Sequence, residues 1–188
     1  MTAVKLEGVG KRFGKHWAVA HVSFEVDAGA TVLLTGSNGA GKTTLLRVLS
    51  TALRPTLGRL SLFGSDCTRD PTGVRPRLAL LTHHSHLYAD LSGRENLELL
   101  ARLITAPAVP IDDALERVGL AGEAADRAVR AYSAGMKRRL GLARVLLARP
   151  ELVLLDEPFG QLDPAGVELM EEAIAELKAG GSTLFVST

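Results

Sequence analysis

Hydrophobic and polar residues follow two different patterns in the segments expected to form strands. Residues 4–7 and 21–26 alternate between apolar and polar side chains, which is typical of strands with one face in the core and one in water. Residues 31–34, 78–81 and 151–155 are short continuous apolar runs, as expected for strands covered on both faces. The chain is therefore predicted to combine antiparallel strands near its start with a buried parallel sheet.

Apolar residues recur at helical spacing between these strands. Helices are expected over residues 43–53, 92–103, 111–118, 133–148 and 163–177. Ser92 followed by Glu95 is a capping-box pattern, and Asp163 before Pro164 supplies an N-cap and a first-turn proline. Alternation of strands and helices predicts an α/β fold with a mainly parallel sheet, an N-terminal antiparallel layer and an inserted helical subdomain.

Length and charge limit the number of domains and the classes of partner. The chain has 188 residues, 46% of them hydrophobic, which suits one domain with a real core. We expect one domain over residues 1–188, with residues 1–91 and 150–188 as the core and about 92–149 as the helical subdomain. A net charge of +1 argues against nucleic acid as a partner.

Two further observations concern the cellular compartment in which the chain is expected to work. The single cysteine, Cys67, cannot form an internal disulfide, which fits a reducing cytoplasm. The N-terminus lacks a signal-peptide pattern, and no apolar run approaches the ~18 residues needed to span a bilayer. We expect a cytoplasmic chain, which would work on the inner face of a membrane only through a partner that spans it.

Residues 36–43, Gly-Ser-Asn-Gly-Ala-Gly-Lys-Thr, fit the phosphate-loop pattern G-x-x-x-x-G-K-[ST]. The glycines allow successive N–H groups to turn towards phosphate oxygens, and the following helix adds its positive end. Lys42 can reach the β- and γ-phosphates, and the Thr43 hydroxyl suits Mg²⁺. A chance glycine-rich turn is the alternative, but a buried strand before the loop and a helix after it favour phosphate binding. The candidate nucleotide-binding residues are Ser37, Asn38, Gly39, Ala40, Gly41, Lys42, Thr43 and Thr44.

Asp156 and Glu157 follow the apolar run 151–155. Carboxylates at the carboxyl end of a parallel strand lie at the edge where such sheets bind ligands. Asp156 can orient Mg²⁺ through its water shell, and Glu157 can polarise an attacking water. Alternatively, they only cap the following turn. Together with the 36–43 loop, they predict hydrolysis of a nucleoside triphosphate with Mg²⁺.

Residues 132–139, Tyr-Ser-Ala-Gly-Met-Lys-Arg-Arg, precede an apolar helix and the Asp156-Glu157-Pro158 strand end. This combination resembles the signature motif of ABC-type ATPases, whose usual form is L-S-G-G-Q. Ser133 and Gly135 are kept, and the resemblance extends over nearly the whole chain.

The resemblance implies an ATP site shared between two ATPase domains arranged head to tail, as a homodimer or heterodimer beneath membrane-spanning subunits. One domain would supply the 36–43 loop, and the other would bring Ser133, Gly135 and Met136 to the γ-phosphate. Ser133 can also be a simple helix cap. The resemblance further places Phe13 on adenine and Asp163 in the D-loop, with ATP and Mg²⁺ as the bound species.

Two positions depart from the family pattern. The family has a glutamine that contacts Mg²⁺, and here His84, or else His83, takes its place. Three histidines within residues 83–86 also raise the hypothesis of a metal site. The family's catalytic histidine would follow Thr188, where the sequence stops, so a C-terminal edge is expected to be missing and turnover of ATP is left open.

The leading hypothesis is the ATP-hydrolysing subunit of an ABC transporter, coupled to its partner near residues 83–91. A finer resemblance, to the haem exporter of cytochrome c maturation, rests on Ser37 in place of a more usual proline and on the compact length. Alternatives are a nucleotide-binding module that dimerises without turnover and a soluble ABC ATPase acting on DNA or ribosomes. A small-molecule P-loop kinase would leave residues 132–139 unexplained.

Overall fold

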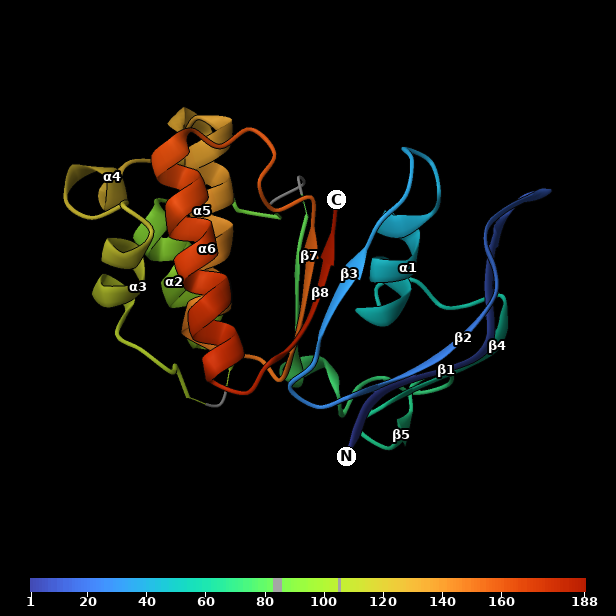
Figure 1. Cartoon of the computed structure of the whole chain (residues 1–188). Helices are drawn as coiled ribbons and strands as arrows, with labels where there is room; N and C mark the ends of the chain where they lie inside the picture. Colours follow the sequence, from blue (N-terminus) through green and yellow to red (C-terminus); the bar gives the residue numbers. More distant parts are fainter. Residues whose placement is uncertain (83–85, 105) are drawn as a thin grey trace. The chain divides into compact units, whose positions relative to one another are not determined.

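The structure, a computed structural model, describes residues 1–82, 86–104 and 106–188. Contacts between Cα atoms divide the chain into two units (Figure 1). The first unit comprises Met1–Leu80, Pro150–Glu157 and Gly181–Thr188, and the second comprises Leu81–Arg149 and Pro158–Gly180. Strands dominate the first unit and helices dominate the second.

An antiparallel sheet occupies the start of the chain, with the strand order β2-β1-β4-β5. Its strands are β1 (Thr2–Phe13), β2 (His16–Asp27), β4 (Leu57–Leu62) and β5 (Ser65–Asp66). Val4, Leu6 and Val9 of β1 are buried against the core. The predicted antiparallel layer is confirmed, and β1 and β2 are longer than the alternating runs 4–7 and 21–26.

A parallel sheet forms the centre of the first unit, with the order β3-β8-β7-β6. Its strands are β3 (Thr31–Leu34), β6 (Leu78–Leu81), β7 (Leu152–Asp156) and β8 (Thr183–Ser187). Every residue of β7 and β8 is buried, as continuous apolar strands require. Helix α1 (Lys42–Leu49) buries Leu46, Val48 and Leu49 in the core that this sheet shares with the antiparallel layer.

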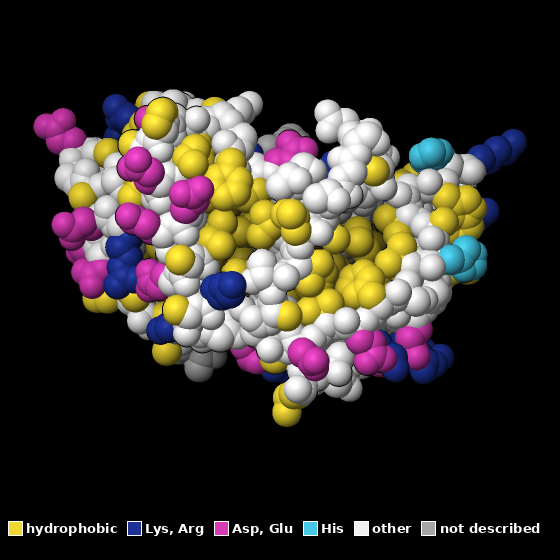
Figure 2. Space-filling view, viewed as in Figure 1, with side chains coloured by type: hydrophobic (Ala, Val, Ile, Leu, Met, Phe, Trp, Pro, Cys, Tyr) yellow, Lys and Arg dark blue, Asp and Glu magenta, His cyan; other side chains and the backbone are white. Residues whose placement is uncertain are grey.

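Strand β3 departs from the expectation that residues 31–34 are covered on both faces. It lies at the edge of the sheet, and its Leu33 is 59% exposed. Val22, Phe24 and Val26 of β2 are also only partly buried. Figure 2 shows apolar side chains open to view in this region of the first unit. The apolar run correctly indicated a strand, but hydrophobicity alone could not show that β3 pairs on one side only among the strands of the described residues.

Replacing a leucine with alanine destabilises the fold more when the leucine is buried, because a cavity is left in the core. Leu154 and Leu33 of this sheet should therefore differ in their effect on the free energy of unfolding. Leu154 is fully buried, so Leu154→Ala is expected to lower the free energy of unfolding by about 2–5 kcal/mol. Leu33→Ala is expected to change it by no more than about 0.5 kcal/mol. Urea unfolding of both variants checks this, and equal losses would contradict the edge position of β3.

The second unit contains helices α2 (Gly93–Ala101), α3 (Ile111–Arg117), α4 (Glu123–Asp126), α5 (Ala134–Ala148) and α6 (Pro164–Ala179). Figure 1 shows α5 and α6 running side by side, and their residues are in contact. An ion pair of 2.6 Å between Arg117 Nη1 and Glu176 Oε1 joins α3 to α6. The structure groups α6 with the helices, whereas the sequence pattern places residues 150–188 in the core.

The capping box predicted at the start of α2 is confirmed. The Glu95 N–H donates to Ser92 Oγ at 3.1 Å, and the Ser92 N–H donates to Glu95 Oε2 at 2.7 Å. The bond from the Ser92 backbone holds the pKa of the Glu95 carboxyl below its ordinary value.

Among the helices of the described residues, none has both the length and the apolar character that a membrane-crossing segment needs.

Candidate phosphate-binding site

The loop between β3 and α1 is shaped by a residue that has to be glycine. Gly41 is the N-cap of α1 and has a φ of 91°, in the left-handed region. A Cβ at this position would lie 2.1 Å from the Ala18 carbonyl oxygen of β2, so a side chain cannot fit. No side chain caps the start of α1, and its first turn holds no acidic residue. The helix therefore presents backbone N–H groups and a positive end to an anion.

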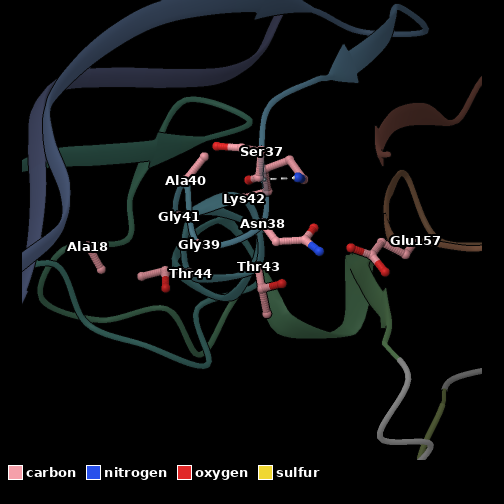
Figure 3. A pocket seen from close by; sticks show the side chains of 10 residues that line it. All are labelled: Ala18, Ser37, Asn38, Gly39, Ala40, Gly41, Lys42, Thr43, Thr44 and Glu157. Atoms are coloured by element: carbon pink, nitrogen blue, oxygen red, sulfur yellow. Dashed lines mark hydrogen bonds between the residues drawn. The ribbon is translucent and has the colours of Figure 1, made fainter.

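Lys42 holds its ammonium group within the loop. Its Nζ donates to the carbonyl oxygen of Gly36 and, at 3.2 Å, to that of Ser37. Figure 3 shows the side chain folded back along the loop, with its bond to the Ser37 carbonyl drawn as a dashed line. These contacts hold a cation at the loop that leads into the N-terminus of α1, and a cation at this place suits a polyphosphate.

Asp156 is brought to the loop by the parallel sheet. It ends β7, is only 1% exposed, and its Oδ2 accepts a hydrogen bond of 2.8 Å from Thr43 Oγ1. Its Oδ1 accepts a second bond of 2.8 Å from Ser187 Oγ, at the end of β8. The hydroxyl of Thr43 and the carboxylate of Asp156 are hard oxygen donors at one place, which fits the ligand preference of Mg²⁺.

The loop and Glu157 line a cleft of about 250 Å³ in the first unit. Figure 3 shows the Glu157 carboxylate directed towards the side of the loop that carries Asn38 and Thr43. The residues lining the cleft are Ala18, Ser37, Asn38, Gly39, Ala40, Gly41, Lys42, Thr43, Thr44 and Glu157. The sequence identified all of them except Ala18, because only the folded β2 brings this small residue against the loop.

Phe13, expected to stack on adenine, lies at the end of β1 and is 50% exposed. The Lys11 ammonium lies 5.4 Å from the centre of its ring. Phe13 is not among the residues that line the cleft. The stacking of Phe13 on adenine therefore stays a prediction.

The candidate signature residues lie in the second unit, at the start of α5. Ser133 is the N-cap, and its Oγ accepts a 3.2 Å bond from the Met136 N–H. A Cβ on Gly135 would lie 3.4 Å from the Gln161 carbonyl oxygen, an ordinary van der Waals contact with the segment that leads into α6. Asp163 caps α6 and accepts a 2.9 Å bond from the Gly166 N–H. Ser133 and Asp163 therefore both act as helix caps, which leaves a role towards a second chain open.

His83 and His84, proposed in place of the family's glutamine, lie outside the described residues. Among residues 1–82, 86–104 and 106–188, no three His, Cys, Asp or Glu side chains gather as a metal site. The metal hypothesis for residues 83–86 therefore stays untested.

A groove of about 120 Å³ lies in the second unit and is lined in part by His86 and Tyr88. Asn96 fixes one wall, because its side chain accepts from the Tyr88 N–H at 2.9 Å and donates to the Tyr88 carbonyl at 3.0 Å. Leu103, which is 76% exposed, and Arg144 also line the groove. Burial lowers the pKa of the Arg144 guanidinium.

The parallel sheet with its phosphate loop and adjacent strand-end carboxylates defines a P-loop nucleoside-triphosphatase fold. Solved structures agree: the ATP-binding subunit of an ABC transporter matches all of this chain and 79% of its own, with a TM-score of 0.89 and 26% identity. The ATP-binding cassette MJ0796, a dimer bound to ADP and Pi, matches with a TM-score of 0.87 at 24% identity, over 98% of this chain and 87% of its own. Residues 19–160 match the ABC transporter family, and the chain belongs to it.

Similar curated proteins include two whose names refer to drug resistance and to transport. The daunorubicin resistance ATP-binding protein DrrA3 of Streptomyces coeruleorubidus is 42% identical over 100% of this chain and 60% of its own length. The bacitracin transport ATP-binding protein BcrA of Bacillus licheniformis is 38% identical over 100% of this chain and 61% of its own length. The chain thus spans about 60% of the length of these relatives.

These relatives correct the finer resemblance to a haem exporter of cytochrome c maturation, which is not supported. That interpretation rested on Ser37 and on chain length. Ser37 lies in the phosphate loop, whose backbone would contact phosphate rather than a transported molecule. A residue at that place therefore carries no information about the transported substrate.

Proposed function

We propose that this chain is the ATP-binding and ATP-hydrolysing subunit of an ABC export system. The observation that carries the proposal is the 2.8 Å bond between Thr43 of the phosphate loop and Asp156 at the end of β7. It brings together two oxygen donors that are far apart in the sequence, beside a cleft lined by Lys42 and Glu157. Membership of the ABC transporter family supports ATP as the nucleotide.

Each group of the site has a distinct task in this proposal. The N–H groups at the start of α1 and the Lys42 ammonium bind the β- and γ-phosphates. Thr43 and Asp156 would hold Mg²⁺, directly and through water, and the ion would offset phosphate charge. Glu157 accepts a proton from the water that attacks the γ-phosphate, and lies on the wall of the cleft where it can reach that water.

Phosphate release tests the reaction itself. The purified chain should release phosphate from ATP when Mg²⁺ is present and fail to do so when the metal is removed with a chelator. Saturable ATP binding without any release would favour the alternative of a nucleotide-binding module that dimerises without turnover. Absence of ATP binding would overturn the proposal altogether.

The partners follow from the family and from the relatives. Proteins named for daunorubicin resistance, bacitracin transport and Nod factor export support an export system, with a membrane-spanning subunit to which this chain binds from the cytoplasmic side. The groove formed by Tyr88, Leu103 and Arg144 offers an apolar rim and a cation for such contact. A second ATPase subunit, identical or different, would complete the nucleotide site.

The shared site predicts the effect of a bulky cation at the start of α5. Ser133→Arg should leave ATP binding to the single chain nearly intact, because the loop and Asp156 lie in the first unit. It should abolish the ATP-dependent dimer, because arginine would fill the space needed by the γ-phosphate of the partner. Light scattering with Glu157→Gln in the background, to retain ATP, measures the dimer.

Glu123→Arg is the matched control, since Glu123 is exposed and begins α4 of the same unit. This variant should dimerise like the parent. An unaltered ATP-induced dimer in Ser133→Arg would contradict the shared site. Circular dichroism of both variants separates this outcome from the loss of the Ser133 helix cap, which is worth about 1 kcal/mol.

A further inference from the structure

Ser187 occupies a buried position where its hydroxyl meets the Asp156 carboxylate and the Glu157 backbone N–H. It is the last residue of β8 and is fully buried. The parallel register of β7 and β8 pairs it with Asp156. Neither the phosphate-loop motif nor the Asp156-Glu157 strand end includes it, because register between strands this far apart in the sequence is set by folding.

The hydrogen bonds of Ser187 have a defined direction. The backbone N–H of Glu157 donates to Ser187 Oγ at 3.0 Å. The Ser187 hydroxyl therefore accepts from Glu157 and directs its own proton to Asp156 Oδ1, at 2.8 Å. Thr43 donates to the other oxygen, Asp156 Oδ2. Two hydroxyls thus hold one carboxylate, one on each oxygen.

Glu157 has a backbone conformation that needs such support. Its φ is 48°, in the left-handed region that side-chain-bearing residues rarely adopt. The bond from its N–H to Ser187 lies at this turn. The direction of the Glu157 side chain towards the cleft depends on the turn, so Ser187 links the orientation of Glu157 to that of Asp156.

We propose that Ser187 is a positioning residue that fixes Asp156 for Mg²⁺ and turns Glu157 towards the nucleotide. The inference rests on the proposed function. A Thr43 hydroxyl would bind the metal through an oxygen lone pair and keep its proton on Asp156 Oδ2, while the bond from Ser187 fixes the other carboxylate oxygen, Oδ1. Groups that orient metal-binding residues in this way commonly alter metal affinity or activity by about 10- to 100-fold when they are removed.

The test compares two substitutions of nearly identical shape. Ser187→Thr keeps the hydroxyl, and Ser187→Val replaces it with a methyl group. Ser182→Ala is the matched control, because the buried Ser182 hydroxyl donates to the Pro150 carbonyl at 2.7 Å near the opposite end of β8. Isothermal titration measures the affinity for ATP with and without Mg²⁺, and phosphate release gives kcat and KM.

The gain in ATP affinity on adding Mg²⁺ is expected to shrink about tenfold in Ser187→Val, with a similar loss in kcat. Ser187→Thr and Ser182→Ala should keep the wild-type gain, and ATP affinity without metal should be equal in all four proteins. A purely structural role would lower the melting temperature of Ser187→Val and Ser182→Ala alike, without changing the response to Mg²⁺.

One outcome would contradict the proposed function, and another would contradict only the role of Ser187. A wild-type chain whose ATP affinity does not respond to Mg²⁺ would overturn the proposed function, and the role of Ser187 with it. A normal wild-type response that Ser187→Val shares would overturn the role of Ser187 alone. If Ser187→Val does not fold, Ser187→Ala carries the same comparison, because it removes the hydroxyl without adding a methyl group.

Discussion

Glu157→Gln is expected to lower the rate of phosphate release from ATP at least about 100-fold, because an amide cannot accept the proton of the attacking water. The affinity for Mg·ATP should stay within about threefold of the wild type, since glutamine keeps the size and shape of the side chain. Multiple-turnover phosphate release and isothermal titration on the same preparations separate the two quantities. The expected result is therefore a chain that binds ATP and does not turn it over.

Glu151→Gln is the matched control for this substitution. Glu151 lies directly before β7, at the end opposite to Glu157, and both of its carboxylate oxygens accept from Arg77 at 2.6 Å. Its replacement weakens an ion pair of the first unit without touching the cleft. Equal losses of activity in both variants would show that the effect of Glu157→Gln is structural.

Lys42→Ala is expected to weaken ATP binding by about 10- to 100-fold, because a charge-assisted hydrogen bond to phosphate is lost. The loop also loses the bonds from Lys42 to the carbonyls of Gly36 and Ser37. Titration with ATP in the presence of Mg²⁺ measures the effect. Lys178→Ala removes an exposed cation from the last turn of α6 and should leave the affinity unchanged.

Unchanged ATP affinity in Lys42→Ala would contradict the phosphate loop as the binding site. A loss of similar size in Lys178→Ala would indicate an effect of net charge alone. Adding salt distinguishes these cases further, because long-range attraction weakens at high ionic strength, whereas contact between Lys42 and a bound phosphate is screened less.

Local patterns predicted those elements that short-range chemistry determines. The alternating residues near the start form the antiparallel strands β1 and β2, and Ser92 with Glu95 forms the capping box of α2. The phosphate loop could be predicted because its tasks require particular residues at consecutive positions. Gly41, for example, stands where a Cβ would meet the Ala18 carbonyl oxygen.

Features that depend on long-range neighbours could not be predicted in the same way. Leu33 belongs to an apolar run like those of β7 and β8, yet it is exposed because β3 lies at the sheet edge. Ala18 and Ser187 have no motif that marks them. Each reaches the site through the position of a strand, and strand order and register are properties of the whole fold.

The central claim is that the first unit binds the phosphates of ATP through the loop between β3 and α1. Titration of the wild-type chain with ATP, ADP and AMP in the presence of Mg²⁺ tests it most directly, because these nucleotides differ only in the phosphates that the loop would contact. We expect ATP and ADP to bind at one site per chain and AMP to bind far more weakly. Equal affinity for AMP and ATP, or no binding of ATP, would contradict the claim.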